Sequence, residues 1–194
     1  MKKTKKNFTL VELLCATAVV VILAGIGFSA YSYASHRGKE AATRSLITRL
    51  EAGLETLKTK HGIYPASASY STIDITVNAD TGIITKIDFG ETVIDTEAAT
   101  SEAKKRYQAQ MKDFLAVVDG ESLKKYIANG KLTDAWGGQI RYKYPGTVNK
   151  IKFDIVAPGA DESFGTAAGT DPCSALTGYQ ENGEWACDDI ANFK

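Results

Sequence analysis

Two kinds of helical pattern follow one another in the first third of the chain. From Leu13 to Ala30 there is no charged side chain, and Leu, Ile, Val and Ala predominate. From 46 to 57, apolar residues recur every three or four positions with Arg, Lys and Glu between them. These apolar residues are Leu46, Ile47, Leu50, Leu54 and Leu57. Because both patterns are helical, we predict one helix over 8–61, about 80 Å long and ended by Gly62.

Alternating apolar and polar residues predict strands in the rest of the chain. The alternation in STIDITV and GIITKIDF, on either side of NADTG, predicts a short hairpin. QIRYKYPG and KIKFDIVAPG alternate around PGTVN and predict a second hairpin. Between them, residues 96–120 predict a helix capped by Thr96 or Thr100, then a short helical turn at SLKKYIANG. The predicted fold class is α+β, with a long N-terminal helix packed on a small antiparallel sheet head.

The apolar half of the long helix predicts a membrane segment. A helix needs roughly 20 apolar residues to cross about 30 Å of hydrocarbon, and residues 8–34 are long enough. Tyr31 and Tyr33 stand where an interfacial aromatic belt would lie, and the four lysines within 2–6 predict a cytoplasmic N-terminus. A cleavable signal peptide is the alternative. Its apolar core is usually about 7–15 residues, whereas this one is longer and runs directly into the amphipathic part.

Charge and composition narrow the function. The chain has 194 residues with 23 basic and 23 acidic side chains, so a nucleic-acid binder is not expected. Its length allows one domain and an extra element. There is no nucleophile elbow and no phosphate loop, and neither His36 nor His61 has a suitable nucleophile nearby. We therefore expect no enzyme.

The three cysteines differ in their surroundings. Cys15 lies in the apolar helix, where a small packing residue is expected. Cys173 and Cys187 flank the insert SALTGYQENGEWA. In a non-cytoplasmic domain they would close a disulfide, worth about 3 kcal/mol for a loop of about 15 residues; in a reducing compartment they would be free thiols. Zinc is disfavoured, because both histidines are far away and no CxxC pair exists.

The aromatic residues near the end of the chain raise two further alternatives. Trp136 precedes a predicted hairpin, where a core position is more common than a ligand-binding one. Tyr179 and Trp185 lie in the insert between the last two cysteines. They leave open a membrane-anchored glycan-binding module as a competing class of function.

The junction between the lysines and the apolar helix carries a motif. Its residues are, in order, Phe8, Thr9, Leu10, Val11 and Glu12. This resembles the prepilin motif of type IV pilins and type II secretion pseudopilins. The resemblance implies that a dedicated peptidase cuts between Asn7 and Phe8 and methylates the new amine of Phe8. Asn7 stands where that family usually has Gly.

Glu12 has a role in the same resemblance. In that family the matching acid neutralises the N-terminal amine of a neighbouring subunit as the filament assembles. An isolated carboxylate near the bilayer costs at least about 2.5 kcal/mol by insertion scales, and an amine on an adjacent subunit is a suitable partner. The alternative is a carboxylate at the headgroup level that reaches water, helped by Lys5 and Lys6.

The end of the chain resembles the major pseudopilin of type II secretion. The matching positions are Asp134, Trp136, Gly137, Tyr142, Tyr144, Pro145, Gly146, Asp154, Gly159, Asp161, Asp189, Ile190 and Asn192. HGIYP at 61–65 is also typical. The middle, roughly 70–130, is longer than in that family, and the insert at 166–187 is extra.

A calcium ion is implied by the same resemblance, because pseudopilins hold one in the C-terminal loop through carboxylates and carbonyls. Asp161 matches one ligand, with the backbone carbonyl of Pro158 beside it. Asp188 or Asp189 is favoured as the second carboxylate, with Asp171 as the alternative. A loop without metal, held by the disulfide and its turns, is the competing interpretation.

The resemblance implies a structural subunit of a type II secretion pseudopilus, which polymerises through its N-terminal helix to support protein export. Its implied partners are itself, minor pseudopilins, the prepilin peptidase and an inner-membrane assembly platform. We expect a leader at 1–7, a transmembrane and assembly helix at 8–34, and a periplasmic head at 35–194 with a C-terminal loop at 157–194. The protein would then cross the bacterial inner membrane once. A major or minor pilin of a type IV pilus, serving adhesion, motility or DNA uptake, is the alternative.

Overall fold

The chain divides into two compact units, residues 1–38 and 39–194. A computed structural model describes residues 10–98, 100–161, 164, 180–181, 184–185 and 190–192, and gives the backbone alone at 24, 26–29, 161, 180–181 and 184–185. We call residues 10–38 the N-terminal segment and residues 39–194 the head.

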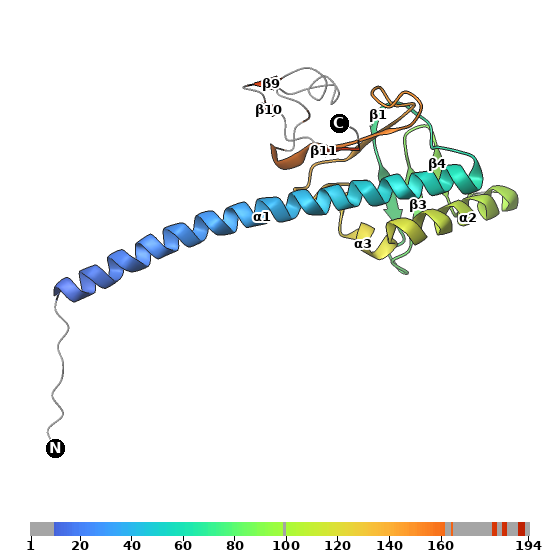
Figure 1. Cartoon of the computed structure of the whole chain (residues 1–194). Helices are drawn as coiled ribbons and strands as arrows, with labels where there is room; N and C mark the ends of the chain where they lie inside the picture. Colours follow the sequence, from blue (N-terminus) through green and yellow to red (C-terminus); the bar gives the residue numbers. More distant parts are fainter. Residues whose placement is uncertain are drawn as a thin grey trace. The chain divides into compact units, whose positions relative to one another are not determined.

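Helix α1 runs without interruption from Leu10 to His61, as the sequence predicts (Figure 1). It ends at the predicted residue. Gly62 has a φ of 73°, a left-handed conformation that glycine adopts without steric cost. Its N–H donates to the carbonyl of Lys58 at 3.0 Å, which satisfies one of the last free carbonyls of the helix.

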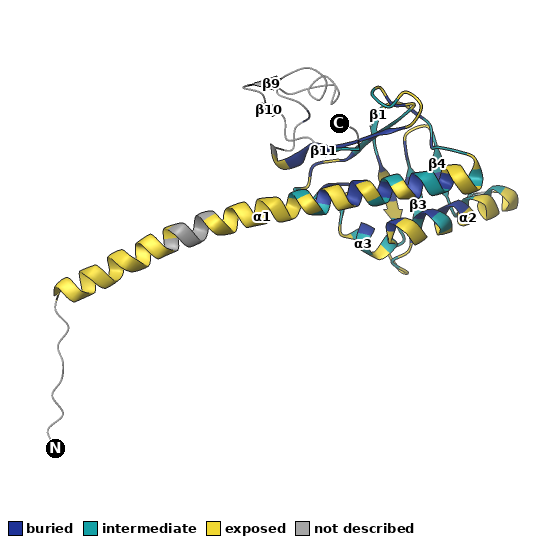
Figure 2. Cartoon of the chain, in the orientation of Figure 1, coloured by how far each residue is buried: buried dark blue, intermediate teal, exposed yellow. Residues whose placement is uncertain are grey.

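Burial changes along α1 as the hydrophobic pattern predicts. The apolar stripe from Leu46 to Leu57 is at most 3% exposed and belongs to the core of the head. In the N-terminal segment, large apolar side chains between Leu10 and Leu23 are 54% to 80% exposed. Figure 2 shows the described part of this segment in the exposed colour throughout. One helix thus has a half that is covered by its own chain and a half that is not.

The membrane segment predicted at 8–34 is not confirmed. Among the residues that the structure describes, no helix combines the length and the apolar character that a membrane crossing requires. Residues 8 and 9, and the side chains of 24 and 26–29, lie outside that description.

The first sheet has four antiparallel strands in the order β1-β7-β8-β11. Their bounds are β1 Ser67–Thr72, β7 Arg141–Tyr144, β8 Asp154–Ala157 and β11 Ile190–Ala191. Strands β7 and β8 are the second predicted hairpin, with Tyr142 opposite Ile155. The end of the chain is tied to this sheet, because the side chain of Asn192 accepts from Ile155 N at 2.8 Å and donates to Phe153 O at 3.1 Å.

The second sheet has five antiparallel strands in the order β4-β3-β2-β6-β5. Their bounds are β2 Asp74–Val77, β3 Ile84–Asp88, β4 Val93–Asp95, β5 Ile127–Ala128 and β6 Lys131–Leu132. Strands β2 and β3 confirm the first predicted hairpin. The predicted antiparallel pairing is also present, but it is divided between two sheets. A further pair, β9 Gln180–Glu181 and β10 Glu184–Trp185, stands apart from both sheets.

The chain passes from the first sheet to the second at Ile73, inside the stretch that the alternation predicts as one strand. Ser71 and Thr72 pair with β7, whereas Asp74 pairs with β3. Ile73 itself is buried, and its carbonyl accepts from Leu132 N at 2.8 Å. The change of partner leaves the alternation intact, so the sequence pattern does not reveal it.

Two helices follow the first hairpin. Helix α2, Ser101–Val118, begins after Thr100 as predicted, although the Thr100 side chain makes no capping hydrogen bond. Helix α3, Gly120–Lys124, covers only the start of the predicted SLKKYIANG turn. The rest of that stretch forms β5 and a tight turn at Asn129 and Gly130, both with positive φ.

The core of the head lies where α1, α2 and the sheets meet. It contains Leu50, Leu54, Phe114, Ile87 and Tyr142, among others, each at most 1% exposed. Gly53 lets α1 and α2 approach closely, because a Cβ at this position would lie 2.5 Å from Val118 Cγ2 and 2.9 Å from Phe114 Cδ2.

Candidate assembly surface and C-terminal loop

The N-terminal segment carries the predicted assembly residue. Glu12 lies in the first turn of α1 and is exposed. A carboxylate in the first turn is favoured by the positive end of the helix dipole, so the helix itself supports an ionised Glu12. The predicted processing residues, Asn7 and Phe8, lie outside the described residues.

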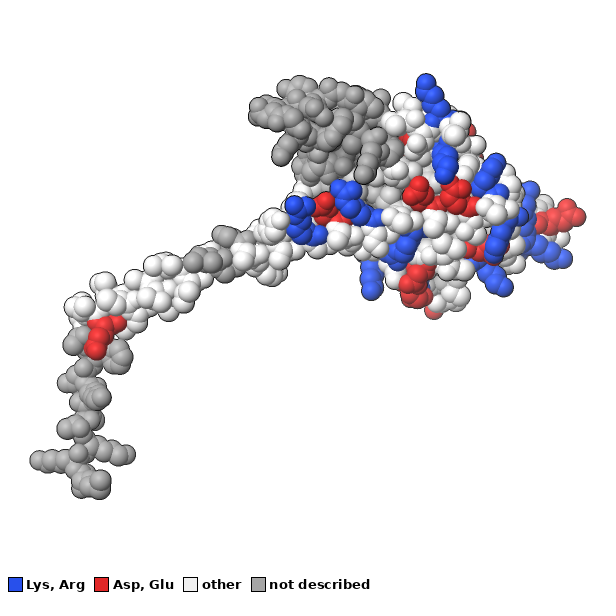
Figure 3. Space-filling model, in the orientation of Figure 1, with Lys and Arg blue, Asp and Glu red and all other residues white. Residues whose placement is uncertain are grey.

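Charge is distributed very differently over the two units. The N-terminal segment shows almost no blue or red in Figure 3, whereas both colours cover the head. After Glu12, the next charged side chain in the sequence is that of Arg37, directly after His36. Arg37 lies over the ring of Tyr33 at 5.5 Å, and its Nε donates to the Tyr33 hydroxyl at 3.3 Å. The apolar surface therefore ends in an aromatic and cationic pair.

The base of the C-terminal loop is organised by one buried carboxylate. Asp134 Oδ1 accepts from the N–H groups of Trp136, Gly137 and Gly138 at 2.9–3.0 Å. Its Oδ2 accepts from Gly159 N at 3.1 Å. Burial raises the pKa of this carboxyl, and the backbone N–H groups act in the opposite direction. Asp134 thus joins the turn before β7 to the loop that follows β8.

A second buried carboxylate holds the other end of the β7–β8 hairpin. Asp154 is fully buried. It accepts from the Tyr70 hydroxyl at 2.9 Å and from the N–H groups of Thr147, Val148 and Asn149 at 2.6–2.9 Å. Both carboxylates match the pseudopilin pattern in the sequence, and the structure gives each a structural reason.

Trp136 packs against the core, partly buried, as predicted. The turn that carries it is also tied to α1, because Ala135 N donates to Thr43 Oγ1 at 3.1 Å. Thr43 is fully buried and has no signal in the sequence beyond its helical position. The sequence therefore identifies the tryptophan but not the threonine that positions its loop.

The predicted calcium ligands are only partly described. Pro158 is buried, and Asp161 ends the short 3₁₀ helix Gly159–Asp161. The Asp161 side chain and residues 171, 188 and 189 lie outside the described residues, as do Cys173 and Cys187. Among the described side chains, no group of three or more His, Cys, Asp or Glu is placed to hold a metal ion. The calcium site and the disulfide stay predictions.

A long helix with an exposed apolar half, joined to an α+β head, defines a pilin-like protein. The family model described as type II secretion system (T2SS), protein G, matches residues 101–173, which is fewer than half of the 194 residues. The protein is therefore pilin-like and close to the major pseudopilin of type II secretion, as the motifs at its two ends indicate. No curated protein and no solved structure matches the chain.

The match begins at Ser101, so it includes α2 and the β5–β6 turn. That the middle of the chain, roughly 70–130, is longer than in the secretion family stays a prediction. The matched family is a component of a secretion system and not a family of enzymes.

Proposed function

We propose that this protein is a structural subunit of a type II secretion pseudopilus that polymerises through its N-terminal helix and supports protein export. The observation that carries the proposal is the exposed apolar half of α1, on a chain whose head matches secretion protein G. The alternative, a pilin of a type IV pilus, has no comparable match in its favour.

The physical reason for the proposal is that the chain leaves the apolar side chains at the start of α1 exposed. The exposed side chains between Leu10 and Leu23 are Leu10, Val11, Leu13, Leu14, Val19, Val20, Val21, Ile22 and Leu23. Burying one such side chain fully is worth about 1.5–3 kcal/mol, and a contiguous apolar surface of this kind marks a membrane or protein contact. Lipid covers this surface in the single subunit, and copies of the same helix cover it in the filament.

Glu12 gives the assembly its register. Between helices in lipid there is little hydrophobic driving force, so packing and polar contacts decide association. A carboxylate that meets the N-terminal amine of a neighbouring subunit fixes one offset between two otherwise similar apolar helices. This role needs the free amine of Phe8, which cleavage after Asn7 produces.

The proposal includes the location and the processing of the chain. Residues 1–7 are the leader, residues 8–34 the membrane and assembly helix, and the head lies in the periplasm. The partners are minor pseudopilins, the prepilin peptidase and the inner-membrane assembly platform.

Calcium is part of the proposal. The ligands would be oxygen atoms of Asp161, of Asp188 or Asp189, and of the Pro158 carbonyl, which is the donor set that calcium prefers. The backbone at Pro158 is held in place, because Pro158 is buried and the N–H of the next residue, Gly159, donates to Asp134. If calcium is bound, a chelator lowers the melting temperature of the head by about 5 °C or more. If the melting temperature is unchanged and the purified protein contains no metal, the calcium site is wrong and the disulfide stabilises the loop without a metal.

The test of the proposed function is direct. The chain is expressed in cells with a complete secretion apparatus, and sheared filaments are collected for electron microscopy and N-terminal sequencing. Filaments built of a chain that begins at methylated Phe8 are the expected result. A dispersed chain that still begins at Met1 would overturn both the processing and the assembly.

A further inference from the structure

The head separates its charges between two neighbouring segments. Residues 74–97, which form β2, β3 and β4, contain six acidic residues and a single lysine. Helix α2 contains four basic and two acidic residues. The net charge of the whole chain is zero, so this separation is a matter of placement and not of composition.

The acidic side chains lie on the outer face of the second sheet. Ile75, Ile87 and Ile94 are opposite one another across the three strands and are at most 3% exposed. Because side chains alternate along a strand, their neighbours face outward. Asp74, Asp88 and Asp95 are such neighbours, and we call these three residues the sheet surface.

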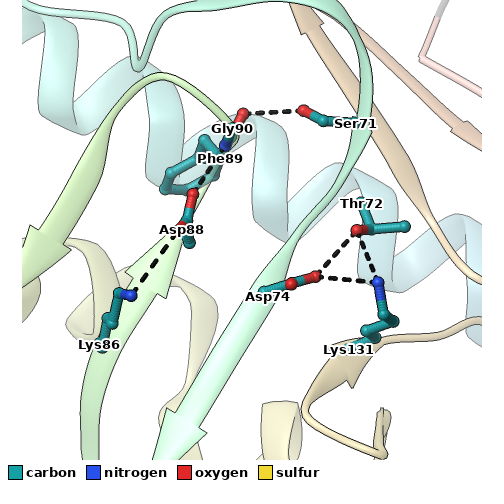
Figure 4. A network of polar contacts seen from close by, with 8 residues as sticks. All are labelled: Ser71, Thr72, Asp74, Lys86, Asp88, Phe89, Gly90 and Lys131. Atoms are coloured by element: carbon teal, nitrogen blue, oxygen red, sulfur yellow. Dashed lines mark hydrogen bonds and ion pairs between the residues drawn. The ribbon is translucent and has the colours of Figure 1, made fainter.

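Repulsion within the sheet surface is only partly relieved. Asp74 stands directly opposite Asp88, and like charges in that position destabilise a sheet. Figure 4 shows the lysines that offset them: Lys131 Nζ lies 3.5 Å from Asp74, and Lys86 Nζ lies 3.7 Å from Asp88. Partly exposed pairs at these distances contribute little. Lys86 also stands directly opposite Asp95, so three carboxylates and two ammonium groups leave the surface a net charge of −1.

The basic side chains lie on the outer face of α2. Lys104, Lys105 and Lys112 are exposed, and we call them the helix surface. Among the described residues, none of the three has a carboxylate within 4.0 Å. The acid that follows Lys112, Asp113, is occupied by Lys60 at 2.8 Å and His61 at 3.0 Å. In Figure 3 blue side chains gather over the end of the head where α2 begins.

The two surfaces point away from each other. The inner face of α2, with Met111 and Phe114, and the inner face of the sheet, with Ile87 and Ile94, share one core. Their outer faces therefore lie on opposite sides of that core and cannot neutralise each other within one chain. Two different complementary patches on opposite sides of a molecule form a heterologous contact, which generates a closed ring or an open, repeating filament of copies.

We propose that the helix surface of one subunit docks against the sheet surface of the next subunit in the filament. The occupant is a second copy of this chain, because the complementary charge is present on the same head. This inference rests on the proposed function, since it requires that the chain assembles. The acidic strands lie before the part that the secretion family matches. The proposal gives them a role in the contact between the heads of adjacent subunits.

Cross-linking between two populations of the full-length chain tests the contact. One population carries Lys105→Cys, and the other carries Asp95→Cys and a tag. Both are expressed together in cells with the secretion apparatus, and Cys15, which is free and exposed, is replaced by Ser in both. We expect a disulfide-linked dimer that contains one tagged and one untagged chain. Each population alone is the control and shows only the linkage that native cysteines give.

Charge reversal is the second test of the proposed contact. Lys105→Glu with Lys112→Glu is expected to lower filament yield about tenfold, because several ion pairs turn into repulsions. Adding Asp74→Lys and Asp95→Lys to the same chain restores the complementarity and the yield. The matched control is Lys125→Glu with Lys150→Glu, two exposed lysines outside both surfaces, with unchanged yield.

The outcomes separate the two claims. If the unmodified chain forms no filaments, the proposed function fails and takes the docking with it. If it forms filaments while the two-population dimer is absent, or while the reversal behaves like its control, the docking is wrong and the proposed function stands. A thermal melt of each variant confirms that the head is folded.

Discussion

The two halves of α1 have the same backbone but opposite relations to the rest of the chain. From Leu46 to Leu57 one apolar stripe is covered by α2 and the sheets, whereas between Leu10 and Leu23 the apolar side chains are exposed. The half between Leu10 and Leu23 leaves its apolar side chains available to other molecules. The half between Leu46 and Leu57 already has its apolar side chains packed in the core of the head. The difference teaches that a single helix serves both stability and assembly, with the division at the boundary between the two units.

The largest effect should come from the covered half. Leu54→Ala truncates a side chain of this half that is 1% exposed and belongs to the core of the head. We expect a loss of about 2–5 kcal/mol in the free energy of unfolding. The matched change in the uncovered half, Leu14→Ala, should leave the melt of the head unchanged in detergent. Equal losses in both variants would contradict the separation.

A smaller effect is expected at the contact between α1 and α2. In Gly53→Ala the new Cβ has no room beside Val118 and Phe114, and overpacking costs about 1–3 kcal/mol. Gly38→Ala is the control, since nothing lies within 4 Å of a Cβ there. That variant should be neutral or slightly more stable, because alanine favours helix. Chemical denaturation of the two variants measures the difference.

The smallest effect concerns pH. Lys60, with His61, lowers the pKa of Asp113 at the end of the head where α1 and α2 meet. A lowered pKa in the folded state contributes stability above the ordinary pKa of the carboxyl, and this stability is lost as the pH falls through the lowered value. Asp113→Asn should therefore melt at a lower temperature at pH 7 and show a smaller drop between pH 7 and pH 3. An unchanged pH profile would show that the pair contributes nothing.

The sequence predicts most of this architecture where the signal is local. The long helix, both hairpins and α2 follow from hydrophobic periods of 3.6 and 2. The change of sheet at Ile73 is missed, because strand alternation does not say which strand will be the partner. β1 pairs with β7, and Ser67 stands opposite Tyr144, far along the chain.

The candidate sites divide in the same way. Glu12 and Trp136 are visible in the sequence because their neighbours form recognisable patterns. The hydrogen bonds that position the C-terminal loop are not visible, because Asp134 collects N–H groups from two distant segments and Thr43 contributes a third contact. Such side-chain bonds to distant backbone depend on tertiary structure and leave no period in the sequence.

The central claim is that α1 assembles copies of the chain through Glu12, and one substitution tests it most directly. Glu12→Gln keeps the size of the side chain and removes its charge, so the neighbouring amine would lose its ionic partner. Filaments from cells with the secretion apparatus are counted by electron microscopy, with Glu121→Gln, an exposed acid of the head, as control. The account predicts that the Glu12→Gln chain stays in the membrane fraction and forms no filaments, while the control forms them normally. Normal filaments from the Glu12→Gln chain would contradict it.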